Sequence, residues 1–247
     1  MKIYLAGPDT MVHYSPELSK QRISVMGSYI YVTERILEYF QYWDLFMDSG
    51  AYTFAQKNTD ITDWNDYLDK YAEFLNAYNI DRFLELDIDK LVGLKEVERL
   101  RKRLEQKTGK QPVPVWHDSR GREYFHDMVK EYKYVAIGGI ASSKTRERTK
   151  GSILYKKYGN WFADKAHEEG AKLHALGFTV QDIHKYRFDS VDSSSWTGGG
   201  RWGVIFYWNG FTLEKTRSKA KKRLDTAAVM RHNLQQWILY QKHAEGL

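Results

Sequence analysis

Residues 188–203 read FDSVDSSSWTGGGRWG and combine two acids, a run of three serines and three consecutive glycines. The pattern predicts a short strand over residues 187–192, which carries Asp189 and Asp192 and ends in a glycine-rich loop over residues 193–203. Three glycines contribute no packing and raise the entropy of the unfolded chain, so we expect this loop backbone to approach a ligand closely. Asp192 is therefore a candidate nucleophile, with a turn-capping role as the alternative.

Strand-like segments alternate with helical patterns along the whole chain. The helical patterns cover residues 62–78, 94–106, 124–132, 161–169 and 180–186. Strands are expected near residues 2–6, 23–27, 44–48, 82–87, 113–117, 134–138, 172–176 and 187–192. The connections have the lengths typical of parallel βαβ units. Eight such units predict a single-domain α/β fold, a (β/α)8 TIM barrel over residues 1–247, with a doubly wound open sheet as the alternative.

The composition excludes several classes of protein. A chain of 247 residues with 42% hydrophobic residues can bury a full core. It has no cysteine, which excludes disulfides, thiolate metal sites and cysteine nucleophiles and is typical of a reducing compartment. No apolar stretch reaches the length of a membrane span, and no long apolar segment follows Met1. We therefore expect a cytoplasmic protein without a membrane partner.

The net charge of +6 comes from bases that gather in two regions. The first is a long basic loop over residues 142–158, and the second begins a C-terminal helical region over residues 214–245. Clustered bases interleaved with aromatic residues are typical of proteins that bind nucleic acid, with a solvated charged face as the alternative. The candidate nucleic-acid contacts are Lys144, Arg146, Arg148, Lys150, Trp196, Trp202, Lys219, Lys221 and Lys222.

Polar residues and glycines stand where the predicted strands end. They are Asp48, Asp87, His117, Gly138 with Gly139, Gly177 and Asp192. In a barrel these strand ends converge on one mouth, where the active site lies. Glu85, Asp87 and Asp89 share one face of their predicted strand by simple alternation. Three acids on one face are costly to bury together, so we expect Glu85 to be an ion-pair partner of a lysine or arginine.

Five short motifs, in this order along the chain, resemble those of the tRNA-guanine transglycosylase family. Asp48-Ser49-Gly50-Ala51-Tyr52 resembles the family's DSGGF/Y element, and Leu86-Asp87 resembles its guanine-reading acid. Ala136-Ile137-Gly138-Gly139-Ile140-Ala141 resembles AVGGLA, Ala175-Leu176-Gly177 resembles MGVG, and residues 188–203 resemble IDMFDCVLPTRSGRNG. The resemblance runs from about Asp44 to Gly203.

The resemblance implies a glycosyltransferase (pentosyltransferase) that exchanges bases and needs no cofactor and no metal. The zinc subdomain of the tRNA enzymes needs cysteine, so this short chain is most similar to the phage branch of DpdA-like DNA 7-deazaguanine transglycosylases. That branch implies DNA modification in a bacterium or a phage-infected host. Guanine in DNA would be exchanged for a derivative such as 7-cyano-7-deazaguanine, so the partners would be guanine-containing DNA and the free 7-deazaguanine base. The oligomeric state stays open.

The resemblance also implies a role for each site residue. Asp192 would form a covalent intermediate with the nucleotide, Asp48 would be the general acid and base, and Asp87 would read guanine. The family's glutamine is replaced here by Trp116-His117-Asp118. Further substrate contacts are expected from Ser49, Gly50, His117, Gly138, Gly139, Gly177, Asp189 and Arg201.

Three other functions are compatible with the sequence. The first is a tRNA-guanine transglycosylase-like enzyme that acts on RNA. The second is a metal-dependent barrel hydrolase that uses His117, Asp118, His174 and Asp192. The third is a non-catalytic nucleic-acid binder that has kept the barrel.

Overall fold

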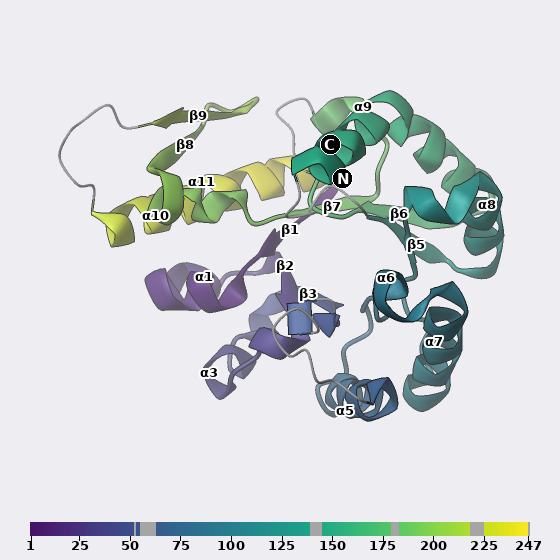
Figure 1. Ribbon diagram of the computed structural model, residues 1–247. Coiled ribbons are helices and arrows are strands. Elements are labelled where there is room, and N and C mark those ends of the chain that lie inside the picture. The colour runs from purple at the N-terminus through teal and green to yellow at the C-terminus, as the bar shows by residue number, and fades with distance from the viewer. Residues whose placement is uncertain (52, 55–62, 139–144, 179–182, 218–224, 247) are drawn as a thin grey trace.

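The computed structural model describes the chain except for residues 52, 55–62, 139–144, 179–182, 218–224 and 247, with the backbone alone at residues 145–154 and 201. Its main feature is a parallel sheet of seven strands in the order β3-β2-β1-β7-β6-β5-β4. The sheet curls into a half-barrel, with helices on its outer side (Figure 1). The strands are β1 (Lys2–Ala6), β2 (Ile23–Ser28), β3 (Trp43–Asp48), β4 (Val115–Trp116), β5 (Tyr134–Ile137), β6 (Lys172–Ala175) and β7 (Ser190–Ser193). The predicted α/β class and parallel strands are confirmed.

The predicted strand over residues 82–87 is not a regular strand. Its Phe83 and Leu84 form isolated parallel bridges, one to Met47 in β3 and one to Val113 just before β4. The Leu84 N–H donates to Met47 O at 2.8 Å, and the Val113 N–H donates to Phe83 O at 2.8 Å. The Ile88 N–H then bonds to Leu86 O, which curls the chain away from the sheet.

Helices connect the strands and cover the outer face of the sheet. They are α1 (Pro8–Tyr14), α2 (Pro16–Ser19), α3 (Glu34–Leu37), α5 (Trp64–Ala77), α6 (Asp89–Val92), α7 (Leu94–Thr108), α8 (Gly121–Glu131), α9 (Thr145–Glu168), α10 (Gly198–Trp202) and α11 (Thr226–Glu245). Helix α5 shows the common pattern: Asp63 caps its N-terminus through the Asn65 N–H, and its buried face carries Leu68 and Tyr71. None of the helices in the described part of the chain is long and apolar enough to cross a membrane.

The long basic loop predicted over residues 142–158 is wrong from residue 145 onward, where α9 begins. Tyr155, Tyr158 and Phe162 recur at helical spacing, and all three belong to the main hydrophobic core or pack against it. Basic residues are good helix formers, so this apolar stripe is enough to continue the helix upstream of the predicted start at residue 161.

The predicted glycine-rich loop over residues 193–203 is also wrong. After β7 the chain forms a 3₁₀ turn (Ser195–Thr197) and then α10, which contains all three consecutive glycines. These glycines allow close packing: a Cβ added to Gly199 would lie 2.6 Å from Val229 Cγ1 and 2.8 Å from Asn233 Nδ2, both in α11. Gly199 and Gly200 therefore serve packing against α11.

The C-terminal region begins with a hairpin, so the helical region predicted over residues 214–245 is wrong at its start. Strands β8 (Val204–Trp208) and β9 (Leu213–Arg217) pair antiparallel outside the curled sheet. Helix α11 follows, capped by the Asp225 carboxylate, and packs against β1 and β2. There the buried Gln241 amide donates to Ile3 O and Ser24 O and so ties this helix to two strands.

Candidate active site

Asp48 is the last residue of β3, and its carboxylate accepts a hydrogen bond from the Gly50 N–H at 3.1 Å. Gly50 has a φ of +66°, and a Cβ there would lie 2.7 Å from Ser28 Oγ, so this turn requires glycine. The Ser49 side chain is buried, and Ser49 O accepts from the Tyr67 hydroxyl at 2.5 Å. Ser49 and Gly50 therefore shape the turn that presents Asp48.

Burial raises the pKa of Asp48 to about 6, and the charges of Asp87 and Asp192 raise it as well. The Gly50 hydrogen bond acts in the opposite direction and only partly offsets this rise. The charges of two other acids, one following residues 82–85 and one in β7, thus act on the carboxylate at the end of β3.

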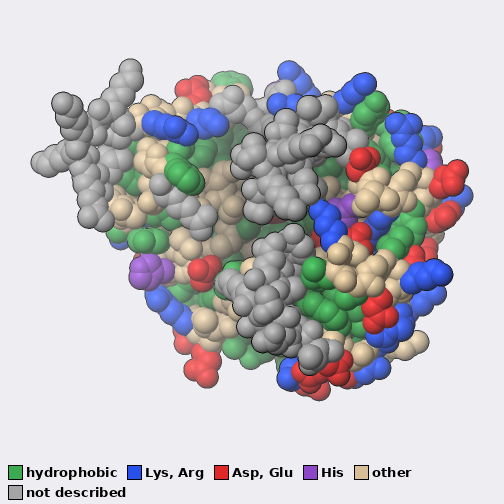
Figure 2. All heavy atoms as spheres, in the orientation of Figure 1, with side chains coloured by type: hydrophobic (Ala, Val, Ile, Leu, Met, Phe, Trp, Pro, Cys, Tyr) green, Lys and Arg blue, Asp and Glu red, His purple; other side chains and the backbone are tan. Residues whose placement is uncertain are grey.

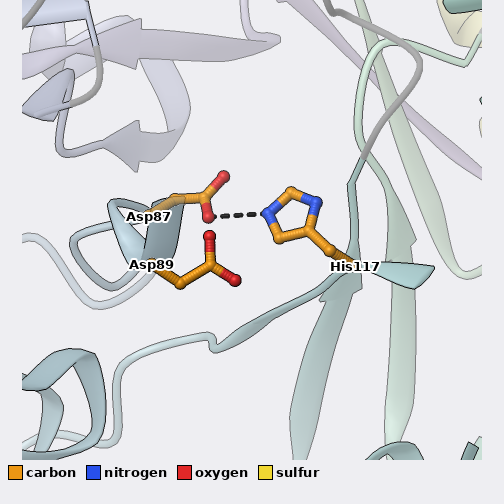
Figure 3. A group of neighbouring side chains, drawn as sticks. All are labelled: Asp87, Asp89 and His117. Carbon is orange, nitrogen blue, oxygen red and sulfur yellow. Dashed lines mark hydrogen bonds and ion pairs between the residues drawn. The ribbon is translucent and has the colours of Figure 1, made fainter. Parts of the chain in front are cut away.

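Asp87 and His117 form an ion pair in which His117 Nε2 lies 2.7 Å from Asp87 Oδ1 (Figure 3). Burial would raise the pKa of Asp87, but the charge and hydrogen bond of His117 outweigh it and lower that pKa. Burial would lower the pKa of His117, and the carboxylates of Asp87 and Asp89 raise it instead. His117 thus pairs with Asp87 just beyond the end of β4.

Gly138 has a different role from the one predicted. Its N–H donates to Trp116 O at 2.8 Å, so it is not available to a ligand. A Cβ at Gly138 would lie 2.5 Å from His117 Cε1. The glycine therefore leaves room for the imidazole ring, and its neighbour Gly139 lies outside the described residues.

Glu85 lies beneath this pair and is fully buried. It accepts from Arg101 Nε at 2.5 Å, from Arg120 Nη1 at 3.2 Å and from the Val115 N–H at 2.8 Å. The predicted ion-pair role of Glu85 is confirmed. Arg120 also donates to Asp89 at 3.0 Å, so it links this buried network to the site.

Asp87, Asp89 and His117 offer ligand atoms that all lie within 4.8 Å of one another (Figure 3). Two carboxylates and an imidazole suit a divalent ion such as zinc or manganese. The Arg120 guanidinium on Asp89 opposes a cation at this position. The four residues proposed from the sequence as metal ligands do not gather at one site. His174 bonds to Asp192, His117 pairs with Asp87, and Asp118 is exposed.

Asp192 is the third residue of β7, and its Oδ1 receives two contacts. The Gly177 N–H donates to Oδ1 at 2.6 Å, and His174 Nε2 lies 3.3 Å from the same oxygen. Gly177 has a φ of +66°, which favours glycine in the turn that aims this N–H. The resemblance implied a role for Gly177 at the site, and the structure gives it direct contact with Asp192.

Behind Asp192, a chain of hydrogen bonds runs through the interior of the curled sheet. His174 is fully buried, and its Nδ1 lies 2.5 Å from Ser190 Oγ, which in turn bonds to the Tyr134 hydroxyl. Sequence reasoning used His174 only as a metal ligand and missed its contact with Asp192. Ser190 and Asp192 are two residues apart on one strand, so their side chains point to the same face of the sheet. This spacing was the signal in the sequence that could have placed them together.

Two further predicted contacts are contradicted. Asp189 lies at the opposite end of the sheet, where its carboxylate accepts from the Leu173 N–H at 2.8 Å and contacts His167 Nε2 at 2.9 Å. Trp196 is fully buried, and its indole N–H donates to Ala6 O at 2.7 Å, so it belongs to the core.

The predicted nucleic-acid contacts are mostly outside what the structure describes. Trp202 is 71% exposed, as a surface contact requires. Figure 2 shows lysine and arginine side chains interspersed with acids over the face it presents. The structure describes only the backbone of Arg146, Arg148, Lys150 and Arg201, all in helices, and none of Lys144, Lys219, Lys221 and Lys222.

No family model matches the chain. No curated protein matches it either. Among solved structures it is similar to a variant of the carboxyl transferase domain of Rhizobium etli pyruvate carboxylase, solved with pyruvate, at 13% identity and a TM-score of 0.39. The match covers 77% of this chain and 40% of that one, and it is too weak to support an argument about function.

Proposed function

We propose that the protein is a DNA guanine transglycosylase that replaces guanine with a 7-deazaguanine derivative through a covalent Asp192–nucleotide intermediate. One observation supports the proposal: the charges of Asp87 and Asp192 act on Asp48 at one edge of the sheet, and the environments of Asp48 and Asp87 differ. The pKa of Asp48 is raised to about 6, which suits a general acid, while the pKa of Asp87 is lowered.

We also propose that the sheet closes into a complete (β/α)8 barrel, with residues 82–85 as its eighth strand position. Support comes from backbone hydrogen bonds on both sides of this segment, to Met47 and to Val113. Closure would bring Asp87 between Asp48 and His117 at a common mouth.

In the first step, the Asp192 carboxylate attacks the anomeric carbon of a guanine nucleotide and the bond to guanine N9 breaks. The bonding electron pair leaves with the base, and the protonated Asp48 supplies the proton that neutralises it. In the second step, the incoming 7-deaza base gives its N9 proton to Asp48 and attacks the same carbon. The ester bond then breaks and returns its electron pair to Asp192.

Asp87 recognises the base in this scheme. Its Oδ1 is held by His117, and the carboxylate accepts hydrogen bonds from guanine N1–H and the 2-amino group. The Asp87–His117 pair takes the place of the glutamine of the tRNA enzymes. A base in a duplex must first leave the stack, at a cost of a few kcal/mol.

The decisive experiment follows the release of labelled guanine from DNA and, separately, from tRNA in the presence of a 7-deazaguanine base. We expect release from DNA, and its loss by at least about 10³-fold in Asp192→Ala, because the covalent route is closed. Asp189→Asn, just before the same strand, is the matched control, and it should retain activity because asparagine still accepts from the Leu173 N–H.

If Asp192→Ala kept wild-type activity, Asp192 would not be the nucleophile. Release of guanine from tRNA alone would favour the enzyme that acts on RNA. The cluster of Asp87, Asp89 and His117 favours the metal-dependent hydrolase as a second candidate. Stoichiometric zinc or manganese in the purified protein, lost in His117→Ala, would support that candidate over base exchange.

A further inference from the structure

His174 in β6 is a fully buried histidine that takes no part in the two steps of the proposed exchange. The rings of Phe46 and Tyr4 contact its ring edge-on, with ring centres 4.8 and 6.0 Å away. Both imidazole nitrogens have partners on β7: Nδ1 lies 2.5 Å from Ser190 Oγ, and Nε2 lies 3.3 Å from Asp192 Oδ1. The ring is therefore fixed by packing and by a polar contact at each nitrogen.

One short segment of the chain supplies both contacts to Asp192 Oδ1. Gly177, in the turn three residues after His174, donates its N–H to this oxygen at 2.6 Å. The register of β6 against β7 pairs His174 with Ser190, and Asp192 lies two residues further along β7 on the same face. An ionised carboxylate only accepts hydrogen bonds, so the imidazole donates to it through Nε2. Two donors from one segment thus hold a single oxygen of the candidate nucleophile.

These two donors favour one state of the proposed reaction over the other. In the free enzyme Asp192 is a charged carboxylate, whereas in the ester of the covalent intermediate Oδ1 is a neutral carbonyl oxygen. A hydrogen bond to a charged oxygen is about twice as strong as one to a neutral oxygen. The donors therefore stabilise the negative charge that returns to Asp192 when the ester bond breaks.

We propose that His174 is a positioning residue that holds Asp192 Oδ1 and speeds the breakdown of the covalent intermediate. This inference rests on the proposed base-exchange function and assigns His174 a role in its second step. The role depends on one hydrogen bond, from Nε2 to Oδ1, and requires no contact between His174 and the substrate.

The test follows the covalent protein–DNA complex itself. The protein reacts with guanine-containing DNA, an excess of a 7-deazaguanine base is added, and the loss of the complex is followed on a denaturing gel. The rate constant of this loss belongs to the complex and does not change when less of the protein is folded. A purely structural role of His174 would lower the yield of complex and leave this rate constant unchanged.

His174→Asn and His174→Gln are a matched pair, because each buries one amide. The asparagine amide can replace Nδ1 beside Ser190 but is too short to reach Asp192, whereas the glutamine amide nitrogen can replace Nε2. The rate constant should fall about 5- to 10-fold in His174→Asn, which is the difference between bonds to a charged and to a neutral oxygen, and recover in His174→Gln. His174→Phe introduces no polar atom and should behave as His174→Asn does.

Phe46→Leu is the packing control, because it removes part of a ring that contacts His174 and keeps both donors. It should lower the Tm and leave the rate constant unchanged. Equal rate constants in His174→Asn and His174→Gln, or an equal fall in Phe46→Leu, would overturn the role of His174 and leave base exchange standing. Absence of a covalent protein–DNA complex in the wild type would overturn the proposed function and this inference with it.

Discussion

Asp48 and Asp87 are two aspartates at one edge of the sheet whose pKa values move in opposite directions. Asp48 is half-buried, is affected by two negative charges and accepts from the Gly50 N–H, whereas Asp87 Oδ1 lies 2.7 Å from His117 Nε2. The same side chain is thus favoured as an acid at one position and as a carboxylate at the other.

The raised pKa of Asp48 predicts a stability change with pH. Between the ordinary pKa of an aspartate, about 3.9, and about 6, the folded protein holds a proton that the unfolded chain releases. The free energy of unfolding should therefore fall as the pH rises through this window. Asp48→Asn should remove the fall and be more stable at pH 7 by about 2–3 kcal/mol.

Urea unfolding of both proteins at pH 4, 5, 6 and 7 measures this difference, and parallel profiles would contradict it. In the proposed reaction, single-turnover guanine release should also decline above a pH of about 6, as Asp48 loses its proton.

At the residue scale, the sequence predicted the positions of the acids better than it predicted their hydrogen-bond partners. Asp48 ends β3, Asp192 lies near the end of β7 and Asp87 follows the bridged segment over residues 82–85, so the pattern of the sequence placed all three at one edge of the sheet. The contact between Asp192 and His174 depends on the register of β6 against β7, in which His174 lies beside Ser190. No local pattern encodes that register.

At the element scale, α10 shows how three glycines can serve packing. Gly199 faces α11 so closely that the Asn233 amide, which donates to Trp196 O and Val204 O, lies against its backbone. Helix α10, β8 and the 3₁₀ turn are joined through this one asparagine.

Two alanine substitutions in α10 test this packing. In Gly199→Ala the new Cβ would overlap Val229 and Asn233, so we expect a loss of about 1–3 kcal/mol in the free energy of unfolding. In Gly198→Ala the nearest atom is 3.6 Å away, so the higher helix propensity of alanine should give a gain of about 0.5–1 kcal/mol. Equal effects in the two variants would contradict the packing role.

Element types followed well from short apolar runs, as in β2 and β3, and from helical periodicity, as in α5 and α7. The errors fell where tertiary contacts override local preference. A glycine run predicts a loop, yet α11 leaves room only for glycine at residue 199. The bases between residues 144 and 157 predict a basic loop. Tyr155 and Tyr158 instead pack against the hydrophobic core and stabilise a helix there.

At the scale of the whole molecule, the segment over residues 82–85 decides whether the curled sheet is closed. It bonds to β3 on one side and to Val113 on the other. The buried Glu85, with Arg101 and Arg120, fastens the same segment to α7 and to the turn after β4.

Amide hydrogen exchange tests closure. If the barrel is closed, the amides of Met47, Leu84, Glu85 and Val113 should be protected as strongly as those within β2 and β3, because they open only when the whole molecule unfolds. The amide of Gly210, an exposed residue in the turn between β8 and β9, is the control and should exchange fast. Rapid exchange at Leu84 and Val113, with β2 protected, would indicate an open half-barrel.

The buried chain from Tyr134 through Ser190 and His174 to Asp192 also has a polarity. When Asp192 is negatively charged it can only accept, so His174 must carry its proton on Nε2. A neutral imidazole then accepts at Nδ1, so Ser190 donates to it and accepts from Tyr134. A negative charge on Asp192 thereby fixes the tautomer of one histidine and the hydrogen-bond direction of two hydroxyls. Nitrogen-15 chemical shifts of the His174 ring would reveal the Nε2–H tautomer. In Asp192→Asn, the hydrogen bonds from Tyr134 to residue 192 would be able to reverse their direction.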